Sequence, residues 1–304
     1  MQYDIIGDIH GDARKLVALL AKMGYRDTSG AWRHPERQAI FVGDFIDRGP
    51  DNVAACQIVR RMTDAGTALA VMGNHEFNAI AWFTEDVSAA GQHLRRHTDQ
   101  NRAQHKDFLA EVEHTPLHRE LIDWFLTLPL WLDLAQIRII HACWHPGYID
   151  EIRSHLQPDC RLDLNLMAAA SDPDAMAFRT VEGLLKGLET PLPNGATFHD
   201  KSGHARNKVR LRWWDQNADT FPTAALLDAP TCATLPALDI PAKFRIGYTD
   251  DKPVFFGHYS MSGSPRVLAP HVACVDYFDK LDNPLVAYQW DGEPELDDGK
   301  FVLV

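Results

Sequence analysis

The sequence predicts an α/β protein built as a layered α/β/β/α sandwich, in which two packed sheets are flanked by helices and carry an inserted cap region. Two observations lead to this prediction. In the first third of the chain, short apolar runs alternate with helical patterns, as expected for parallel strands joined by helical crossovers. Towards the C-terminal end, strand patterns follow one another, which indicates antiparallel strands and a second sheet.

The first third of the chain should contain three strands and two helices. The expected elements, in chain order, are Gln2–Ile6 (strand), Asp12–Met23 (helix), Ala39–Val42 (strand), Asp51–Met62 (helix) and Thr67–Met72 (strand). In a parallel sheet of this kind, functional groups gather at the carboxyl ends of the strands.

The rest of the chain divides into insertions and later strands. We expect one domain over residues 1–304, with a helical insertion at about 84–128 and an irregular cap at about 146–245. The helices expected in the first insertion are Asn101–Glu113 and Leu117–Leu126. The later strands are expected at Leu130–Leu134, Ile137–His141, Pro253–Phe256, His271–Val275, Leu285–Trp290 and Phe301–Val304.

Composition excludes several classes of function. The formal net charge of −12 argues against a protein that coats nucleic acid or an anionic membrane. The five cysteines are scattered and form no C-x-x-C pair, so reduced thiols are expected rather than a disulfide framework. No apolar run is long enough to span a bilayer, and no signal-peptide pattern opens the chain. We therefore expect a cytoplasmic protein, with its oligomeric state left open.

Three polar segments flanked by glycine carry the candidate chemistry. They are Gly7–Gly11 (GDIHG), Gly43–Gly49 (GDFIDRG) and Gly73–Glu76 (GNHE), and each follows a predicted strand and precedes a helix. The three should therefore emerge at the same edge of a parallel sheet.

The residue types in these segments suit metal binding. Asp8 and His10 are two positions apart, so both can reach one ion, and the two oxygens of Asp44 can bridge two cations about 3.5–4 Å apart. His141 and His258 stand at the ends of later strands and can complete a second site. Carboxylate, imidazole and amide ligands suit Mn²⁺, Fe or Zn²⁺.

These motifs resemble the phosphoprotein phosphatase branch of the calcineurin-like metallophosphoesterases, whose signature is GDxHG, GDxxDRG and GNHE. The resemblance covers the first 80 residues or so firmly. It implies two divalent metal ions, with Mn²⁺ expected and Fe, Zn²⁺ or Ni²⁺ as alternatives. The implied ligands are Asp8 and His10 for the first ion, Asp44 as the bridge, and Asn74, His141 and His258 for the second.

The same resemblance implies the catalytic groups. His75 would be the general acid that protonates the leaving oxygen, Asp47 would orient it, and Arg48 would bind two phosphate oxygens. A planar guanidinium matches phosphate geometry, and an imidazole paired with a carboxylate can donate a proton near neutral pH.

Two departures from the family pattern leave alternatives open. The segment His141–His145 reads HACWH where the family usually has His-Gly-Gly, so His145 rivals His141 as a ligand, and we prefer His141 because it ends the strand. The second phosphate-binding arginine has no clear position. The basic run 201–212 offers Arg206, Arg210 and Arg212, and we take Arg206 and Arg212 as candidate substrate contacts.

Residues outside the motifs are expected to be structural. The histidines expected on the surface are His93, His97, His105, His114 and His118. Trp213 and Trp214 are expected in the core, and Cys143 is expected to be a small packed side chain.

The expected function is hydrolysis of phosphomonoesters, with phosphoserine or phosphothreonine in proteins as the leading substrate. The GDxxDRG and GNHE forms motivate this choice. The alternative is a nucleotide hydrolase similar to the symmetrical dinucleoside tetraphosphatases. A third hypothesis, from a different class, is a catalytically dead metal-binding scaffold.

Overall fold

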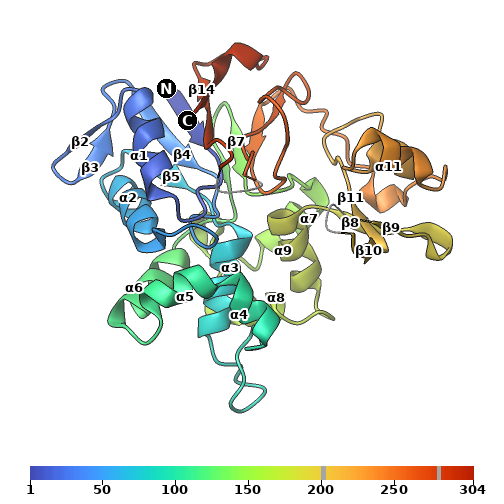
Figure 1. Cartoon of the computed structure of the whole chain (residues 1–304), viewed down its shortest axis with the longest axis horizontal. Coiled ribbons are helices and arrows are strands. Elements are labelled where there is room, and N and C mark those ends of the chain that lie inside the picture. The colour runs from blue at the N-terminus through green and yellow to red at the C-terminus, as the bar shows by residue number, and fades with distance from the viewer. Residues whose placement is uncertain (200–202, 279–281) are drawn as a thin grey trace.

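A computed structural model describes residues 1–199, 203–278 and 282–304 (Figure 1). The layered α/β/β/α architecture expected from the sequence is confirmed. Lys201 and Ser202, which open the basic run, lie outside the described residues.

The first sheet has five strands in the order β15-β14-β1-β4-β5. β1 pairs in parallel with β4, and β4 in parallel with β5, whereas β14 is antiparallel to both β1 and β15. The first and last strands of the chain, β1 and β15, therefore flank the same strand, β14. The strand bounds are Gln2–Ile6 (β1), Arg37–Phe41 (β4), Ala68–Ala70 (β5), Val286–Trp290 (β14) and Phe301–Leu303 (β15).

The second sheet has four strands in the order β13-β12-β7-β6. Its strands are Trp131–Asp133 (β6), Arg138–Ile140 (β7), Val254–Phe256 (β12) and Val272–Cys274 (β13). β12 pairs in parallel with both β7 and β13, and only β6 with β7 is antiparallel. The expectation of antiparallel strands towards the C-terminal end is thus confirmed for β14 and β15 and wrong for β12 and β13.

The two sheets pack face to face. Ile5 and Ile40 from the first sheet share one buried apolar cluster with Ile139 and Phe255 from the second, and all four side chains are fully buried. The outer face of the first sheet is covered by α1 (Ala13–Lys22) and α2 (Asn52–Asp64) (Figure 1). Strands covered on both faces read as continuous apolar runs, which explains the sequence pattern of the first third.

The segment expected to be a helical insertion contains helices that differ in detail from the prediction. The single helix expected at Asn101–Glu113 is two helices that meet at His105. After α3 (Asn74–Phe83) come α4 (Asp99–Gln104), α5 (Lys106–Val112) and α6 (Pro116–Phe125).

Residues 146–245 are more ordered than the irregular cap we expected. Three helices pack together there: α7 (Pro146–Arg153), α8 (Leu164–Ala170) and α9 (Met176–Lys186). The buried residues of α9 include Ala177, Val181, Leu184 and Leu185, a helical spacing that sequence analysis missed. Beyond α9 the chain forms short ribbons and helices, and Trp213 and Trp214 are buried in the core as expected.

The short elements beyond α9 are β8 (Glu189–Pro191), β9 (Phe198–His199), β10 (Ala205–Arg206), β11 (Lys208–Arg210), α10 (Phe221–Ala224) and α11 (Ala229–Thr234). A hairpin of β2 (Arg26–Thr28) and β3 (Ala31–Arg33) was also not expected. Its two turn residues, Ser29 and Gly30, both have positive φ, as a tight two-residue hairpin turn requires. Among the described residues, no helix combines the length and apolar character needed to cross a membrane.

Candidate metal centre

The candidate site lies where strands of both sheets end. The three glycine-flanked motifs follow β1, β4 and β5, while His141 follows β7 and His258 lies two residues beyond β12. Because these five strands run parallel to a neighbour within their sheets, their carboxyl ends deliver the side chains to a common edge. All six residues expected to bind metal are brought together there.

The first cluster joins His10 to two carboxylates. His10 Nε2 lies 4.0 Å from Asp8 Oδ2 and 3.9 Å from Asp44 Oδ2. The other ring nitrogen, Nδ1, lies 3.2 Å from the carbonyl oxygen of Ile46, which can only accept a hydrogen bond. Nδ1 therefore carries the proton, and the lone pair of Nε2 faces the carboxylates.

The second cluster lies on the other oxygen of Asp44. His141 Nε2 is 3.4 Å from Asp44 Oδ1 and 3.0 Å from Asn74 Oδ1, and His258 Nδ1 is 2.6 Å from Asn74 Oδ1. His141 Nδ1 donates to the carbonyl of Val42 at 2.7 Å, so the neutral form of this imidazole presents the lone pair of Nε2. Asp44 thus stands between two groups of potential ligands, one on each carboxylate oxygen.

The chemistry of these donors fits divalent cations. Among the described residues, the buried atoms Asp8 Oδ1 and His258 Nε2 have no hydrogen-bond partner. Burial, then repulsion from Asp276 and Asp44, raises the pKa of Asp8 well above its ordinary value. Buried acceptor atoms that lack hydrogen-bond partners raise the free energy of the folded protein unless a cation neutralises them. Burial and then the charge of Arg210 hold the pKa of His258 well below its ordinary value, so this imidazole is neutral and able to bind metal.

His75 and Asp47 form a pair beside the two clusters. His75 Nδ1 lies 2.5 Å from Asp47 Oδ2, and His75 Nε2 lies 3.8 Å from Asp44 Oδ2. Burial alone would lower the pKa of His75, but the charges of Asp44 and Asp47 outweigh it and raise this pKa above its ordinary value. A raised pKa favours the protonated imidazole that a general acid requires.

Backbone strain is concentrated at the same residues. His10, Asp44, Asp47, Arg48 and His258 all have φ between 47° and 72°, in the left-handed region that side chains other than glycine rarely occupy. Such conformations cost about 1–3 kcal/mol each and cluster where a fold holds functional groups in place.

Arg48 stands at the rim of the site. Its side chain is exposed, and its guanidinium carbon lies 5.5 Å from the centre of the Phe278 ring. The Phe278 ring in turn lies 4.6 Å from the His10 ring, measured between centres. Arg48 is therefore next to the metal-ligand candidates and open to solvent, where a phosphate could reach it.

Two buried carboxylates that sequence analysis did not single out brace the site. The Glu76 carboxylate accepts hydrogen bonds from the backbone N–H groups of Asp44 (2.8 Å), Phe45 (2.8 Å) and Gly73 (3.0 Å), and so ties the second motif to the third. Asp276 accepts from Ser260 N at 2.6 Å and from Phe278 N at 2.8 Å. Glu76 belongs to a recognised motif and could have been found, whereas the nearness of Asp276 depends on the second sheet.

The structure separates the two rival histidines. His141 is fully buried beside Asp44 and Asn74, whereas His145 accepts a hydrogen bond from Tyr148 N at 3.2 Å and begins α7. The ring of His145 stacks on Tyr148, with ring centres 3.8 Å apart. The geometry therefore favours His141 as the ligand.

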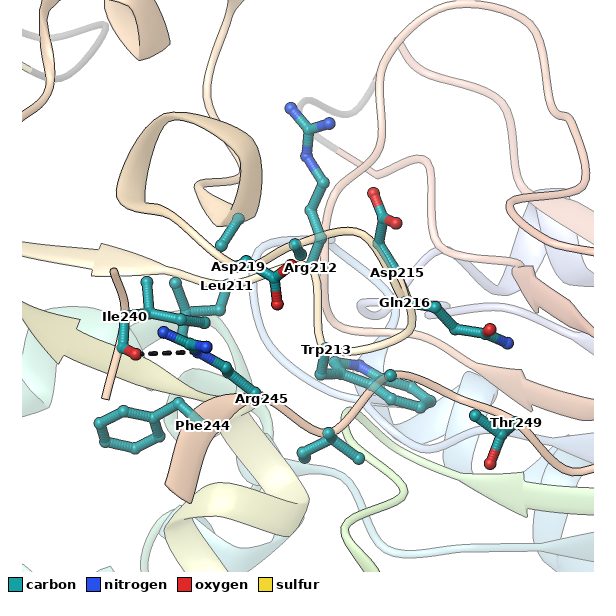
Figure 2. Close-up of a pocket in the computed structure, with 14 residues that line it drawn as sticks. Leu211, Arg212, Trp213, Asp215, Gln216, Asp219, Ile240, Phe244, Arg245 and Thr249 are labelled. Carbon is teal, nitrogen blue, oxygen red and sulfur yellow. Dashed lines mark hydrogen bonds between the residues drawn. The ribbon is translucent and has the colours of Figure 1, made fainter. Parts of the chain in front are cut away.

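The three candidate arginines differ in their surroundings. Arg210 lies close to the site: its guanidinium carbon is 5.5 Å from the centre of the Tyr259 ring, and its charge, second to burial, lowers the pKa of the neighbouring His258. Arg206 is exposed on β10. Arg212 lines a cavity of about 310 Å³, yet Figure 2 shows its guanidinium pointing away from the Trp213 and Arg245 side chains that also line it.

The expectation that the remaining histidines are surface residues is wrong for two of them. His105 and His118 are buried, with 1% and 6% of their surface exposed. His105 Nδ1 lies 2.8 Å from Asp47 Oδ2, so it is part of the candidate site. No motif marks His105, because it reaches Asp47 from a helix break 58 residues along the chain.

Comparison with known proteins agrees with this geometry. The sequence profile of the calcineurin-like phosphoesterase family matches residues 1–176. The asymmetrical bis(5'-nucleosyl)-tetraphosphatase PrpE of Oceanobacillus iheyensis is 32% identical over 148 residues, which cover 48% of this chain and 56% of that protein. The PrpE of Halalkalibacterium halodurans is 45% identical over 76 residues, which cover 25% of this chain and 31% of that protein.

The matches to these curated relatives span about half of their length or less. Among solved structures, the cold-active protein-tyrosine phosphatase of a Shewanella species aligns over 99% of this chain and 80% of its own, with a TM-score of 0.49 and 18% identity. Because the family profile matches more than half of its 304 residues, the chain belongs to the calcineurin-like phosphoesterase family.

Proposed function

We propose that this chain is a phosphohydrolase that works with two divalent metal ions, for which Mn²⁺ is the expected metal. The arrangement of Asp44 supports this proposal: one oxygen faces His10 and the other faces His141. His10 and Asp8 would hold one ion, while Asn74, His141 and His258 would hold the other. Bound ions would neutralise phosphate charge and lower the pKa of a water molecule.

The chain's own residues would supply the proton and orient the substrate. His75, whose pKa is raised by the charges of Asp44 and Asp47, would donate a proton from Nε2 to the leaving oxygen, because Nδ1 is engaged with the Asp47 carboxylate. The exposed guanidinium of Arg48 would bind two phosphate oxygens at the rim. The buried carboxylate of Asp47 would hold the imidazole in one orientation.

A cavity beside the site supports a nucleoside polyphosphate as the substrate. It has a volume of about 1130 Å³ and begins at Tyr259 and Ser260, directly after His258. Its lining includes the cations Arg206, Lys208, Arg210, Arg212 and Arg266, against the acidic residues Glu189, Asp215 and Asp228.

This basic lining is notable in a chain of net charge −12. Phe198 and Trp214 also line the cavity and offer aromatic surface. Positive charge together with aromatic surface suits an extended phosphate chain that carries a base. The PrpE relatives, named bis(5'-nucleosyl)-tetraphosphatases, point to the same substrate class.

Phosphoserine or phosphothreonine in proteins is the second candidate substrate. The GDxxDRG and GNHE forms favour it, because they resemble the protein-phosphatase version of the signature. The scaffold hypothesis is the weakest, because every proposed ligand is present together with His75 and Arg48.

Turnover of a substrate panel with Mn²⁺ distinguishes these functions. We expect hydrolysis of diadenosine tetraphosphate to exceed that of phosphoserine and phosphothreonine peptides. The products would be AMP and ATP if cleavage is asymmetrical, and two molecules of ADP if it is symmetrical. Turnover of the phosphopeptides alone would overturn the nucleotide proposal. No metal-dependent hydrolysis of p-nitrophenyl phosphate would favour the scaffold.

A matched pair of variants tests the cavity itself. Arg212→Gln should raise KM for the dinucleotide and leave KM for p-nitrophenyl phosphate nearly unchanged, because the small ester does not extend into the cavity. Arg119→Gln is the control, since this exposed arginine lies on α6 and does not line the cavity. Equal KM values for the dinucleotide in Arg212→Gln and the unsubstituted protein would show that the cavity does not bind this substrate.

A further inference from the structure

Asp47 holds two imidazoles on one oxygen, those of the partly buried His75 and the buried His105. Its Oδ2 atom lies 2.5 Å from His75 Nδ1 and 2.8 Å from His105 Nδ1. The three side chains come from the second motif, the third motif and the junction of α4 with α5. A carboxylate oxygen can accept from two donors, so both imidazoles donate through Nδ1–H.

The hydrogen bond from His105 affects the pKa of Asp47. Burial would raise the pKa of Asp47, but the hydrogen bonds from His105 and His75 outweigh it and lower this pKa. Within the described part of the chain, Asp47 Oδ1 is buried without a hydrogen-bond partner. The hydrogen bonds that orient the Asp47 carboxylate are therefore those made by Oδ2. Removal of His105 would leave His75 as the only side chain, among those that the structure describes, that donates to this carboxylate.

The position of His105 follows from the break between two helices. Its backbone, with φ of −106° and ψ of 10°, closes α4 and opens α5. The carboxylate of Glu111 on α5 accepts hydrogen bonds from Asn52 N at 2.7 Å and Val53 N at 2.9 Å, the first two residues of α2. Asn52 Oδ1 in turn accepts from Asp47 N at 2.6 Å. The α5 helix is thus fixed to the same loop that His105 contacts.

Packing alone does not account for a histidine at this position. His105 is 1% exposed, and its Nε2 atom is buried and has no hydrogen-bond partner among the described residues. An unsatisfied buried polar atom is destabilising, and an aliphatic side chain of similar size would avoid the cost. The group that this site uses is therefore the Nδ1–H, which Asp47 accepts.

We propose that His105 is a positioning residue, which holds the Asp47 carboxylate in the orientation that aims His75 at the leaving oxygen. This inference rests on the proposed role of His75 as the proton donor. It gives α4 and α5 a part in catalysis, although neither helix carries a metal-ligand candidate.

Two variants of His105 separate positioning from packing. His105→Leu removes the donor, whereas His105→Asn places an amide N–H where Nδ1–H stood. The assay uses phenyl phosphate, whose leaving oxygen needs a proton, and p-nitrophenyl phosphate, whose leaving group departs without one. For phenyl phosphate, His105→Leu should lower kcat about tenfold or more with KM nearly unchanged, as part of the effect of a positioned acid. The loss with p-nitrophenyl phosphate should be much smaller, and His105→Asn should restore most of the lost kcat.

A control comes from another buried histidine of the same helical segment. His118 lies on α6, and its ring packs edge-on against Phe83 and Phe108 rather than on Asp47. His118→Leu should change the kcat ratio of the two esters little, and metal content should be normal in all three variants.

Equal losses for both esters, or equal losses for His105→Leu and His105→Asn, would overturn the positioning role. If the unsubstituted protein hydrolyses neither ester with metal, the proposed function fails instead, and the inference fails with it. The activity of the unsubstituted protein therefore distinguishes failure of the proposed function from failure of the positioning role alone.

Discussion

At the scale of the residue, the candidate site consists of groups held in unfavourable states. Asp8 and Asp44 are each only 2% exposed, and Asp44 also has a strained backbone with φ of 53°. Neither burial nor strain is explained by packing, since both cost free energy in a protein without bound cations. Both costs are explained if these buried carboxylates serve to bind a cation.

Substitution of Asp44 and of His75 should stop turnover for different reasons. Asp44→Asn should lower the amount of bound metal, because it removes the charge shared by both ligand clusters. His75→Asn should leave metal content near normal while kcat falls about 10²–10⁴-fold, the usual effect of losing a proton donor. Elemental analysis alongside kcat distinguishes the two. Equal metal loss in both variants would contradict the role of His75 as the acid.

Gly257→Ala should damage the site without changing any polar group. A Cβ at this position would lie 2.1 Å from Asp8 Oδ1, far inside contact distance. The Asp8 carboxylate would have to move, so metal affinity and kcat should both fall. Gly299→Ala is the control, because its Cβ would lie 3.4 Å from the nearest atom. Metal titration followed by activity measures the effect, and normal metal affinity in Gly257→Ala would place Asp8 outside the ligand set.

At the scale of the element, the start of α2 links the helical segment to the site. The three contacts of the Glu111 carboxylate include the backbone N–H groups of Asn52 and Val53, and the Asn52 side-chain amide at 2.7 Å. The first N–H groups of a helix have no partner within the helix. A carboxylate at this end accepts hydrogen bonds from them, and its negative charge interacts favourably with the positive end of the helix dipole. The cap is supplied from α5 rather than by the residue before the helix.

Glu111→Ala should destabilise the protein by about 1–3 kcal/mol, because it leaves capped N–H groups without a partner. Glu120→Ala is the control: Glu120 forms an exposed ion pair with Arg60 at 2.7 Å, and such pairs contribute about 0–1 kcal/mol. Urea unfolding of both variants gives the two free energies. Similar values for both would show that the cap from α5 contributes no more than an exposed ion pair.

At the scale of the whole molecule, the site joins segments that are distant in the chain. Asp8 Oδ2 accepts a hydrogen bond from His258 N at 3.0 Å across 250 residues, and the pair connects the first sheet to the second. Bound cations would add to this connection and offset repulsion among Asp8, Asp44 and Asp276. The thermal stability of the molecule should therefore depend on metal.

Removal of metal by chelation should lower Tm, and added Mn²⁺ should restore it. Free metal at 100 times its Kd stabilises a folded protein by about 2.7 kcal/mol, provided that the unfolded chain does not bind it. Differential scanning fluorimetry measures the shift. In Asp44→Asn the shift should be much smaller, and a shift of full size in that variant would mean that the metal binds elsewhere.

Local patterns determined much of the fold. Short apolar runs and helical spacing, together with glycine at the turns, were sufficient for β1, α1, α2 and α6, because these elements bury apolar residues in a regular pattern. The break at His105 was not predicted, because the surrounding sequence is helical on both sides and the interruption depends on contacts with α2 and Asp47. Pairing of β12 with β7 and β13 was also missed, since strand direction is set by the path of the chain between strands.

The sequence by itself determined the ligand candidates, because three motifs at strand ends carry Asp8, His10, Asp44 and Asn74 within short and recognisable spacings. The motifs also assigned His75 as the proton donor and Asp47 as the residue that orients it. Only the tertiary structure separated the surroundings of His141 and His145, brought Arg210 close to His258 and brought His105 to Asp47. These choices depend on distances between segments far apart in the chain, and such distances arise from the packing of two sheets and their helices, which no local pattern encodes.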